Sequence, residues 1–244
     1  MRILAIVSYN GFNYQGWQKQ PNAPTVQETI EGVLSKYFNR PIVIYGAGRT
    51  DAGVHALGQR FHFDIDEETL DLDRLIYSIN CMLPEDIKIE DMEEVDLDFH
   101  CRYNAKEKVY GYNILLDSKD PLFYHIMYLC PYNLDLDTLK DALTHFIGKH
   151  NFKNFTSKET DDDNFVREIY DIDVNINGKE VSVMFRGSGF MRYMIRYIIG
   201  TAIEAARDRL TIEEIDELLD ENSERNIVSY KAPACGLVLL DVVY

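Results

Sequence analysis

A single carboxylate stands inside a glycine-rich loop in the first half of the chain. Asp51 follows a β-type run at 42–45 and has glycines on both sides, among them Gly53. Because glycine lets the backbone turn tightly and approach a ligand, this spacing indicates an aspartate held on a rigid loop where it could act on a substrate. Aspartate is also a common turn residue. The loop alone therefore also fits a turn cap, or an ion pair between Asp51 and Arg49.

Two further candidates come from spacing later in the chain. Arg192 and Arg196 are four residues apart, which places them on one face of a predicted helix. Such pairs are also ordinary on solvated helix faces. Tyr110 and Tyr112 share one face of a predicted strand, and periodicity does not choose between them. Either tyrosine also fits a place in the core.

The chain of 244 residues has a formal net charge of −16, which resists a polyanionic partner, since Lys and Arg normally carry binding to phosphates. The acidic residues are clustered, however, at 64–73, 85–98, 159–163 and 213–224. From 186 to 209, five arginines stand against two acidic residues, a local balance of +3. An acidic exterior with a basic groove would attract a polyanion locally and repel it elsewhere.

The four cysteines are far apart and form no Cys-x-x-Cys pair, and the six histidines show no helical i, i+4 pair. These spacings favour buried thiols over a disulfide framework and predict no metal site. No apolar run approaches the ~18 residues that span a bilayer, and the amino terminus lacks the layout of a secretion signal. We therefore expect a cytoplasmic protein without a membrane segment.

Periodicity predicts the element order βαββαβ in the first half of the chain. The strands are expected at 2–9, 42–45, 60–65 and 86–94, and the helices at 26–38 and 71–82. Thr25 and Glu28 form a capping-box pattern before the first helix.

The second half repeats this order with one insertion. Strands are expected at 103–116, 165–175, 180–187 and 237–243, helices at 135–147 and 190–207, and a short acidic helix at 211–220. We therefore predict an α+β fold of two ferredoxin-like halves, residues 1–100 and 101–244, each an antiparallel sheet with helices on one face.

A family resemblance rests on several motifs. The string Gly48–Ala56 is similar to the signature loop of the tRNA pseudouridine synthase A family at all nine positions. Other similar segments follow in the family's order, at 9–20, 25–28, 80–87, 99–105, 108–112, 189–196 and 231–237. The resemblance therefore covers nearly the whole chain.

The resemblance implies that the two antiparallel sheets meet at a central cleft. It implies an enzyme that isomerises uridine to pseudouridine at positions 38, 39 and 40 of the anticodon stem-loop of tRNA, acting as a homodimer. Because the isomerisation is internal, no cofactor is predicted.

The resemblance also implies roles for individual residues. Asp51 would be the essential carboxylate, as nucleophile or as base, Arg196 its cationic partner, and Tyr110 the ring that stacks on the target base. Arg49 would help to turn the nucleotide out of the RNA stem. The other implied substrate contacts are Leu237, Trp17, Lys19 and Arg192.

The chain departs from the family's pattern at two positions. The family usually has His where Tyr193 stands, and often a hydrophobic residue in place of Arg60. These departures concern RNA contacts more than the reacting carboxylate. One alternative is therefore a paralogue that modifies other RNA uridines. Another is a non-catalytic tandem RRM-like protein, although no RNP-type motif is recognisable.

Overall fold

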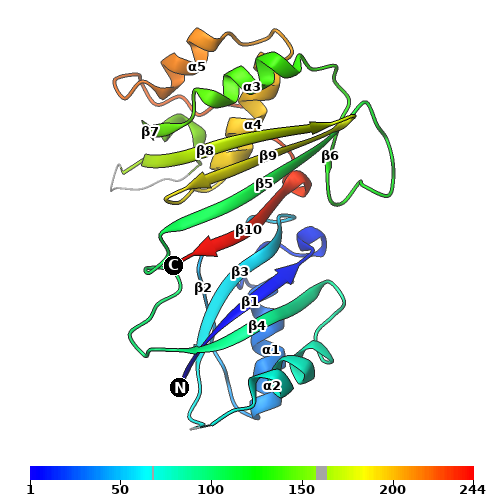
Figure 1. Cartoon of the computed structure of the whole chain (residues 1–244), viewed down its shortest axis with the longest axis vertical. Helices are drawn as coiled ribbons and strands as arrows, with labels where there is room; N and C mark the ends of the chain where they lie inside the picture. Colours follow the sequence, from blue (N-terminus) through cyan, green and yellow to red (C-terminus); the bar gives the residue numbers. More distant parts are fainter. Residues whose placement is uncertain (68, 158–163) are drawn as a thin grey trace. The chain divides into compact units, whose positions relative to one another are not determined.

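The chain divides into two units, and within each unit most strand pairs are antiparallel (Figure 1). The computed structural model describes residues 1–67, 69–157 and 164–244. The first unit comprises Met1–Lys106 with Val238–Tyr244, and the second comprises Glu107–Leu237. The expected α+β class is confirmed. The acidic segment at 159–163 lies outside the described residues.

The first unit has the strand order β4-β1-β3-β10, with β2 beside β3. All these pairs are antiparallel except β3 with β10, which pair in parallel. Helices α1 and α2 contact each other, and α2 packs on β4. The elements are β1 (Arg2–Tyr9), η1 (Gly11–Asn13), α1 (Val26–Phe38), β2 (Tyr45–Gly46), β3 (His55–Asp64), α2 (Leu72–Asn80), β4 (Ile87–Val95) and β10 (Leu237–Val243).

The second unit has the strand order β5-β9-β8-β7, all antiparallel, with β6 parallel to β5. Helix α4 lies beside α3 and is buried on almost every side (Figure 1). The elements are β5 (Glu107–Leu116), β6 (Tyr128–Cys130), α3 (Leu136–Thr144), β7 (Gly148–Asn151), η2 (Lys153–Phe155), β8 (Val166–Asn177), β9 (Glu180–Gly187), α4 (Met194–Ala205), α5 (Ile212–Leu219) and η3 (Ala234–Gly236).

The prediction of a strand at 42–45 is mostly wrong, although buried and exposed side chains do alternate along this segment. Ile42 and Ile44 are buried, but only Tyr45 and Gly46 pair with a neighbouring strand. The amides of Ile42 and Ile44 donate instead to side chains of α1, Ser35 Oγ at 2.8 Å and Glu31 Oε1 at 3.2 Å. A helix thus satisfies the backbone groups that a sheet would otherwise satisfy.

Three other local expectations are corrected. The helix expected at 190–207 begins only at Met194, because Tyr193 has a left-handed backbone with φ +65°. The short strands β6 and β7 were not predicted, since three or four residues are too few to show a period. Cys81 is exposed, against the expectation of buried thiols. No helix in the described ranges is long and apolar enough to cross a membrane.

Candidate functional site

The loop around Asp51 joins β2 to β3 and is held at its backbone by the segment that follows β1. Trp17 N–H donates to the carbonyl oxygen of Thr50 at 3.1 Å, and Gly53 N–H donates to that of Tyr14 at 3.2 Å. Asp51 lies between these two clamps and is itself half-buried. We call residues 48–54 the Asp51 loop.

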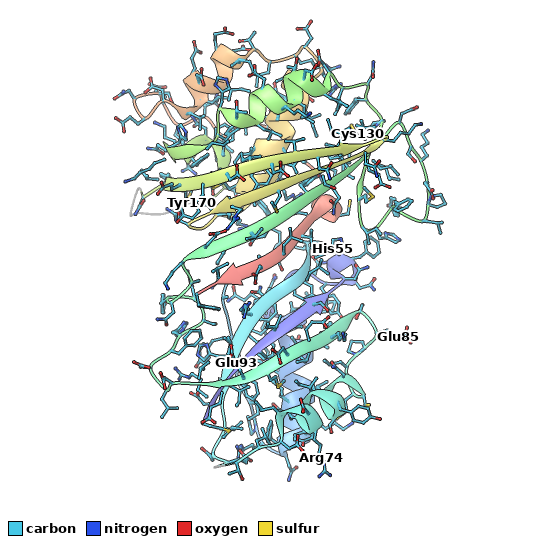
Figure 2. The ribbon with its side chains drawn as sticks, viewed as in Figure 1. His55, Arg74, Glu85, Glu93, Cys130 and Tyr170 are labelled. Carbon is cyan, nitrogen blue, oxygen red and sulfur yellow. The ribbon has the colours of Figure 1, made fainter. Side chains whose placement is uncertain are left out.

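Buried side chains of β1 and β3 also support the Asp51 loop. The Tyr9 hydroxyl lies 2.8 Å from Thr50 Oγ1, and burial raises the pKa of Tyr9, so that it stays a neutral phenol. His55, at the start of β3 (Figure 2), accepts the Gly11 N–H through Nδ1 at 3.1 Å. Gln59 Nε2 donates to the Gly48 carbonyl oxygen at 3.0 Å. Each end of the loop is therefore tied to the sheet.

Gly16 shows how closely the two segments approach. Its φ is +90°, and a Cβ there would lie 2.6 Å from the Thr50 carbonyl oxygen and 3.1 Å from the Asp51 carbonyl carbon. Only glycine fits both the space and the backbone conformation. The 9–20 motif therefore supplies the surface on which the Asp51 loop rests.

Arg49 does not act as a staple for Asp51. Its side chain is exposed, and no carboxylate in the described part of the chain forms an ion pair with it. This result removes the turn-staple alternative for Arg49. It leaves an exposed cation beside Asp51 on the loop.

Trp17 and Lys19 stand in different surroundings. The indole of Trp17 is only 1% exposed, and it packs against Phe61 and Gly46. Lys19 is exposed, and its ammonium lies 3.5 Å from Glu31 Oε2. Trp17 therefore supports the loop from inside the first unit, whereas Lys19 remains accessible.

The second unit separates the two candidate tyrosines of β5. Tyr112 is fully buried, and its hydroxyl donates to the Pro233 carbonyl oxygen at 2.8 Å. Burial raises the pKa of Tyr112 well above its ordinary value. Tyr110 is 8% exposed and meets the Phe190 ring edge-on at 5.4 Å. Tyr112 is thus bound to the core by its polar group.

Arg196 projects from the first turn of α4 toward the segment that precedes η3. Its Nε donates to the Ala232 carbonyl oxygen at 2.8 Å, and the Ala232 N–H donates back to the Arg196 carbonyl oxygen at 2.9 Å. Leu237, the first residue of β10, is 6% exposed. Cys235 lies between Ala232 and Leu237 in the sequence. Burial raises the pKa of its thiol, and the positive charge of Arg196 partly opposes this shift.

The basic pocket expected between 186 and 209 forms only in part. Three of its arginines are bound to carboxylates: Arg186 to Glu107 at 2.7 Å, and Arg207 and Arg209 to Glu204 at 2.5 and 3.9 Å. The other two, Arg192 and Arg196, lie at the ring of Tyr193.

Lys231 joins Arg192 and Arg196 at that ring. The distances from the ring centroid are 4.8 Å to Arg192 Cζ, 5.3 Å to Arg196 Cζ and 4.3 Å to Lys231 Nζ. We call these four residues the Tyr193 cluster. In the sequence, Lys231 and Tyr193 lie in the family-like segments 231–237 and 189–196, but the resemblance implied no site role for Lys231 and marked Tyr193 only as a departure.

One group of side chains in the described ranges could hold a metal ion, namely His62, His100 and Cys101, with ligand atoms within 4.8 Å of one another. Two of these side chains, His62 and Cys101, already take part in hydrogen bonds within the protein. The Cys101 thiol donates to the Tyr45 carbonyl oxygen at 2.9 Å, and its sulfur lies 3.1 Å from His62 Nδ1. Burial, with Arg2 and His100, lowers the pKa of His62 to about 4. The absence of a metal stays a prediction.

Comparisons with known proteins agree with the motifs. A family model described as tRNA pseudouridine synthase matches residues 5–104 and 142–244. A protein named tRNA pseudouridine synthase A from Exiguobacterium sp. (strain ATCC BAA-1283 / AT1b) is 40% identical over 243 residues, covering 100% of this chain and 98% of that protein. Proteins of the same name from Acetivibrio thermocellus (40% identity, 99% of each chain) and Streptococcus gordonii (38% identity, 100% of this chain and 98% of that one) also match.

Among solved structures, the crystal structure of a Cbf5-Nop10-Gar1 complex aligns with 82% of this chain and 54% of the other. The TM-score is 0.38 and the sequence identity 13%, so this likeness adds nothing to the sequence matches.

Proposed function

Because the chain belongs to the tRNA pseudouridine synthase family, it isomerises uridine to pseudouridine in tRNA, and we propose that Asp51 is the carboxylate on which this reaction depends. The observation that carries the proposal is the support of the Asp51 loop. Backbone hydrogen bonds hold the loop on either side of Asp51, and Gly16 packs against its main chain. A reacting group must be fixed to within about 1 Å, and this loop supplies such fixation.

The reaction replaces a carbon–nitrogen bond between uracil and ribose by a carbon–carbon bond. The glycosidic bond breaks, the base turns within the site, and a ring carbon bonds to the sugar. That carbon loses a proton and the freed nitrogen gains one, so the change is internal and redox-neutral. A carboxylate can serve as nucleophile or as base for these steps. No cofactor is needed for the balance, and its absence stays a prediction.

We assign the second unit's part in the reaction to Tyr110 and Arg196. Tyr110, rather than Tyr112, is proposed to stack on the target base, since the hydroxyl of Tyr112 is bound within the core. Arg196 is proposed as the cation that keeps Asp51 ionised. Leu237 is proposed to line the uracil pocket.

The remaining contacts are proposed to bind and open the RNA. Arg49, exposed and without a carboxylate ion pair among the described residues, suits insertion into a stem to turn out a nucleotide. Arg192 and Lys19 are proposed to bind RNA from outside. Trp17 is buried beside the loop, and its contact with RNA stays a prediction.

The proposed targets are positions 38, 39 and 40 of the anticodon stem-loop, and the proposed assembly is a homodimer. A cytoplasmic location stays a prediction. Mapping pseudouridines in tRNA from cells with and without the gene tests the target. Loss at the three anticodon-arm positions supports it, whereas loss only at other uridines would identify a paralogue with another target.

The role of Asp51 is tested by Asp51→Asn, which keeps the shape and removes the charge. We expect product formation to fall by at least ~10³-fold, while tRNA affinity changes by less than about threefold. Asp66→Asn is the matched control, because that side chain is 93% exposed. An Asp51→Asn enzyme with more than about a tenth of the normal rate would contradict the proposal. A wild-type protein that binds tRNA and forms no product would instead be a binding module.

A further inference from the structure

The geometry points to a binding site for an RNA backbone phosphate in the second unit, formed by Arg192 and Lys231 and organised by the ring of Tyr193. The inference rests on the proposed function, because it takes tRNA as the polyanion. It adds Lys231 as a binding residue and Tyr193 as a positioning residue, neither of which the family motif assigns.

The Tyr193 cluster brings positive charges together in an acidic protein. Three cationic groups lie within 5.3 Å of one ring centroid, in a chain whose net charge is −16. By contrast, the exposed ammonium of Lys179 in the same unit lies 3.2 Å from the carboxylate of Asp117. No carboxylate of the described residues forms an ion pair with Arg192 or Lys231. Arg192 and Lys231 are therefore a local excess of positive charge, which a phosphate would neutralise.

The ring explains why the cations gather. An aromatic face attracts cations through its quadrupole, and this attraction offsets part of the repulsion between them. The Tyr193 hydroxyl also accepts a hydrogen bond from Arg192 Nη2 at 2.9 Å. Tyr197 meets the ring edge-on at 6.2 Å. A histidine at this position would offer a smaller ring and no hydroxyl to accept the hydrogen bond from Arg192.

The backbone fixes both ends of the arrangement. The Arg192 carbonyl oxygen accepts the Thr156 hydroxyl at 3.0 Å. On the other side, the main chain before and after Lys231 is bound to α4. Ala232 exchanges hydrogen bonds with Arg196, and the Tyr230 carbonyl oxygen packs so closely on Gly200 that a Cβ there would lie 1.9 Å away. The main chain therefore places Arg192 and Lys231 close to each other, and both side chains are exposed.

Salt-dependent binding tests the site. The affinity of an unmodified tRNA transcript is measured between about 50 and 300 mM salt for the wild-type protein and for Lys231→Gln. We expect affinity to fall about fivefold and the slope of log affinity against log salt to become shallower by about 1, because one phosphate contact is lost. Lys179→Gln, the same charge change on a paired lysine of the same unit, should leave the slope unchanged.

The role of Tyr193 is tested by two substitutions. Tyr193→Leu removes the ring and should raise KM about tenfold with kcat changed less than twofold, whereas Tyr193→Phe keeps the ring and should stay within about twofold of wild type. An unchanged salt slope in Lys231→Gln, or a Tyr193→Leu defect in kcat alone, would overturn the inference. Both readouts use whichever tRNA the enzyme modifies, so a different target position in the tRNA would leave both outcomes unaffected.

Discussion

In the Asp51 loop the main chain itself is held, whereas in the Tyr193 cluster the charged ends of side chains are gathered on a ring. Trp17 and Tyr14 bind the backbone beside Asp51, and Gly16 leaves it no room to shift. Around Tyr193 the contacts are cation–ring distances of 4.3 to 5.3 Å, and two of the three cations are exposed. In the first arrangement contacts fix the backbone beside the reacting group, and in the second the charged groups lie at the ends of long side chains.

The difference matches what each region is proposed to do. A group that breaks and forms bonds loses its effect when it moves by about 1 Å. A phosphate contact is less directional, because electrostatic attraction falls off slowly with distance. Small changes should therefore damage the Asp51 loop more than the Tyr193 cluster, and substitutions in both regions test this ordering.

Gly16→Ala should give the largest effect. The new Cβ would lie 2.6 Å from the Thr50 carbonyl oxygen at a φ of +90°, so the backbone around Asp51 must shift. We expect kcat to fall by about 10²-fold and the free energy of unfolding to fall by about 2–4 kcal/mol. Pseudouridine formation and urea unfolding measure the two effects.

Gly32→Ala is the matched control for that substitution. Gly32 lies within α1, and a Cβ there would meet nothing within 4 Å. Because alanine favours a helix, this variant should be more stable by about 0.5–1 kcal/mol, with normal activity. Equal losses in the two variants would mean that the close fit at Gly16 does not matter to Asp51.

Acid should weaken the first unit, because the buried His62 there has a lowered pKa. The pKa of His62 is about 4 in the folded protein, against about 6.5 in an unfolded chain. Between these values the unfolded state binds more protons, so the free energy of unfolding falls as pH drops from about 6.5 to about 4. The loss from His62 should reach about 3 kcal/mol and should not grow below pH of about 4.

Trp17 makes this loss measurable, since it is the only tryptophan and lies buried beside the Asp51 loop. Its fluorescence during urea unfolding at several pH values reports the first unit. His62→Gln, which does not titrate, should flatten the dependence in this window. A dependence that stays as steep without His62 would assign it to other groups.

Tyr112→Phe tests whether the segment near Lys231 depends on a buried hydrogen bond. The Tyr112 hydroxyl donates to the Pro233 carbonyl oxygen, close in sequence to Lys231. Removing it leaves that oxygen without its donor and should cost about 1–2 kcal/mol of unfolding free energy. Tyr110→Leu is the counterpart, because it removes the ring that is proposed to stack on the target base, and we expect it to lower the rate more than Tyr112→Phe does. The opposite pattern would exchange the roles of the two tyrosines.

Sequence patterns predicted those features that depend on neighbours along the chain. The elements β1, α1 and α2 and the hairpin of β8 and β9 lie within a few residues of their expected places. The Asp51 loop was found because its glycines and its motif are contiguous.

The features that the sequence did not predict depend on residues far apart in the chain. The main chain of Ile42 and Ile44 is satisfied by side chains of α1, and β10 pairs with β3, which lies about 180 residues earlier. Lys231 reaches the Tyr193 ring across 38 positions of sequence. Contacts between residues far apart in the sequence leave no local pattern. The residue type alone does not tell whether a side chain faces solvent or an aromatic ring.

Lys19→Gln should give the smallest effect and sharpens the comparison between cations. Lys19 and Lys231 are both exposed, but Lys19 lies 3.5 Å from Glu31, whose other oxygen accepts the Ile44 N–H. An exposed ion pair contributes less than about 1 kcal/mol, so stability should hardly change. A phosphate must also compete with Glu31 for Lys19, and we therefore expect tRNA affinity to fall less than about threefold, below the loss in Lys231→Gln. If the two substitutions weakened binding equally, a neighbouring carboxylate would not distinguish structural from RNA-binding cations in this protein.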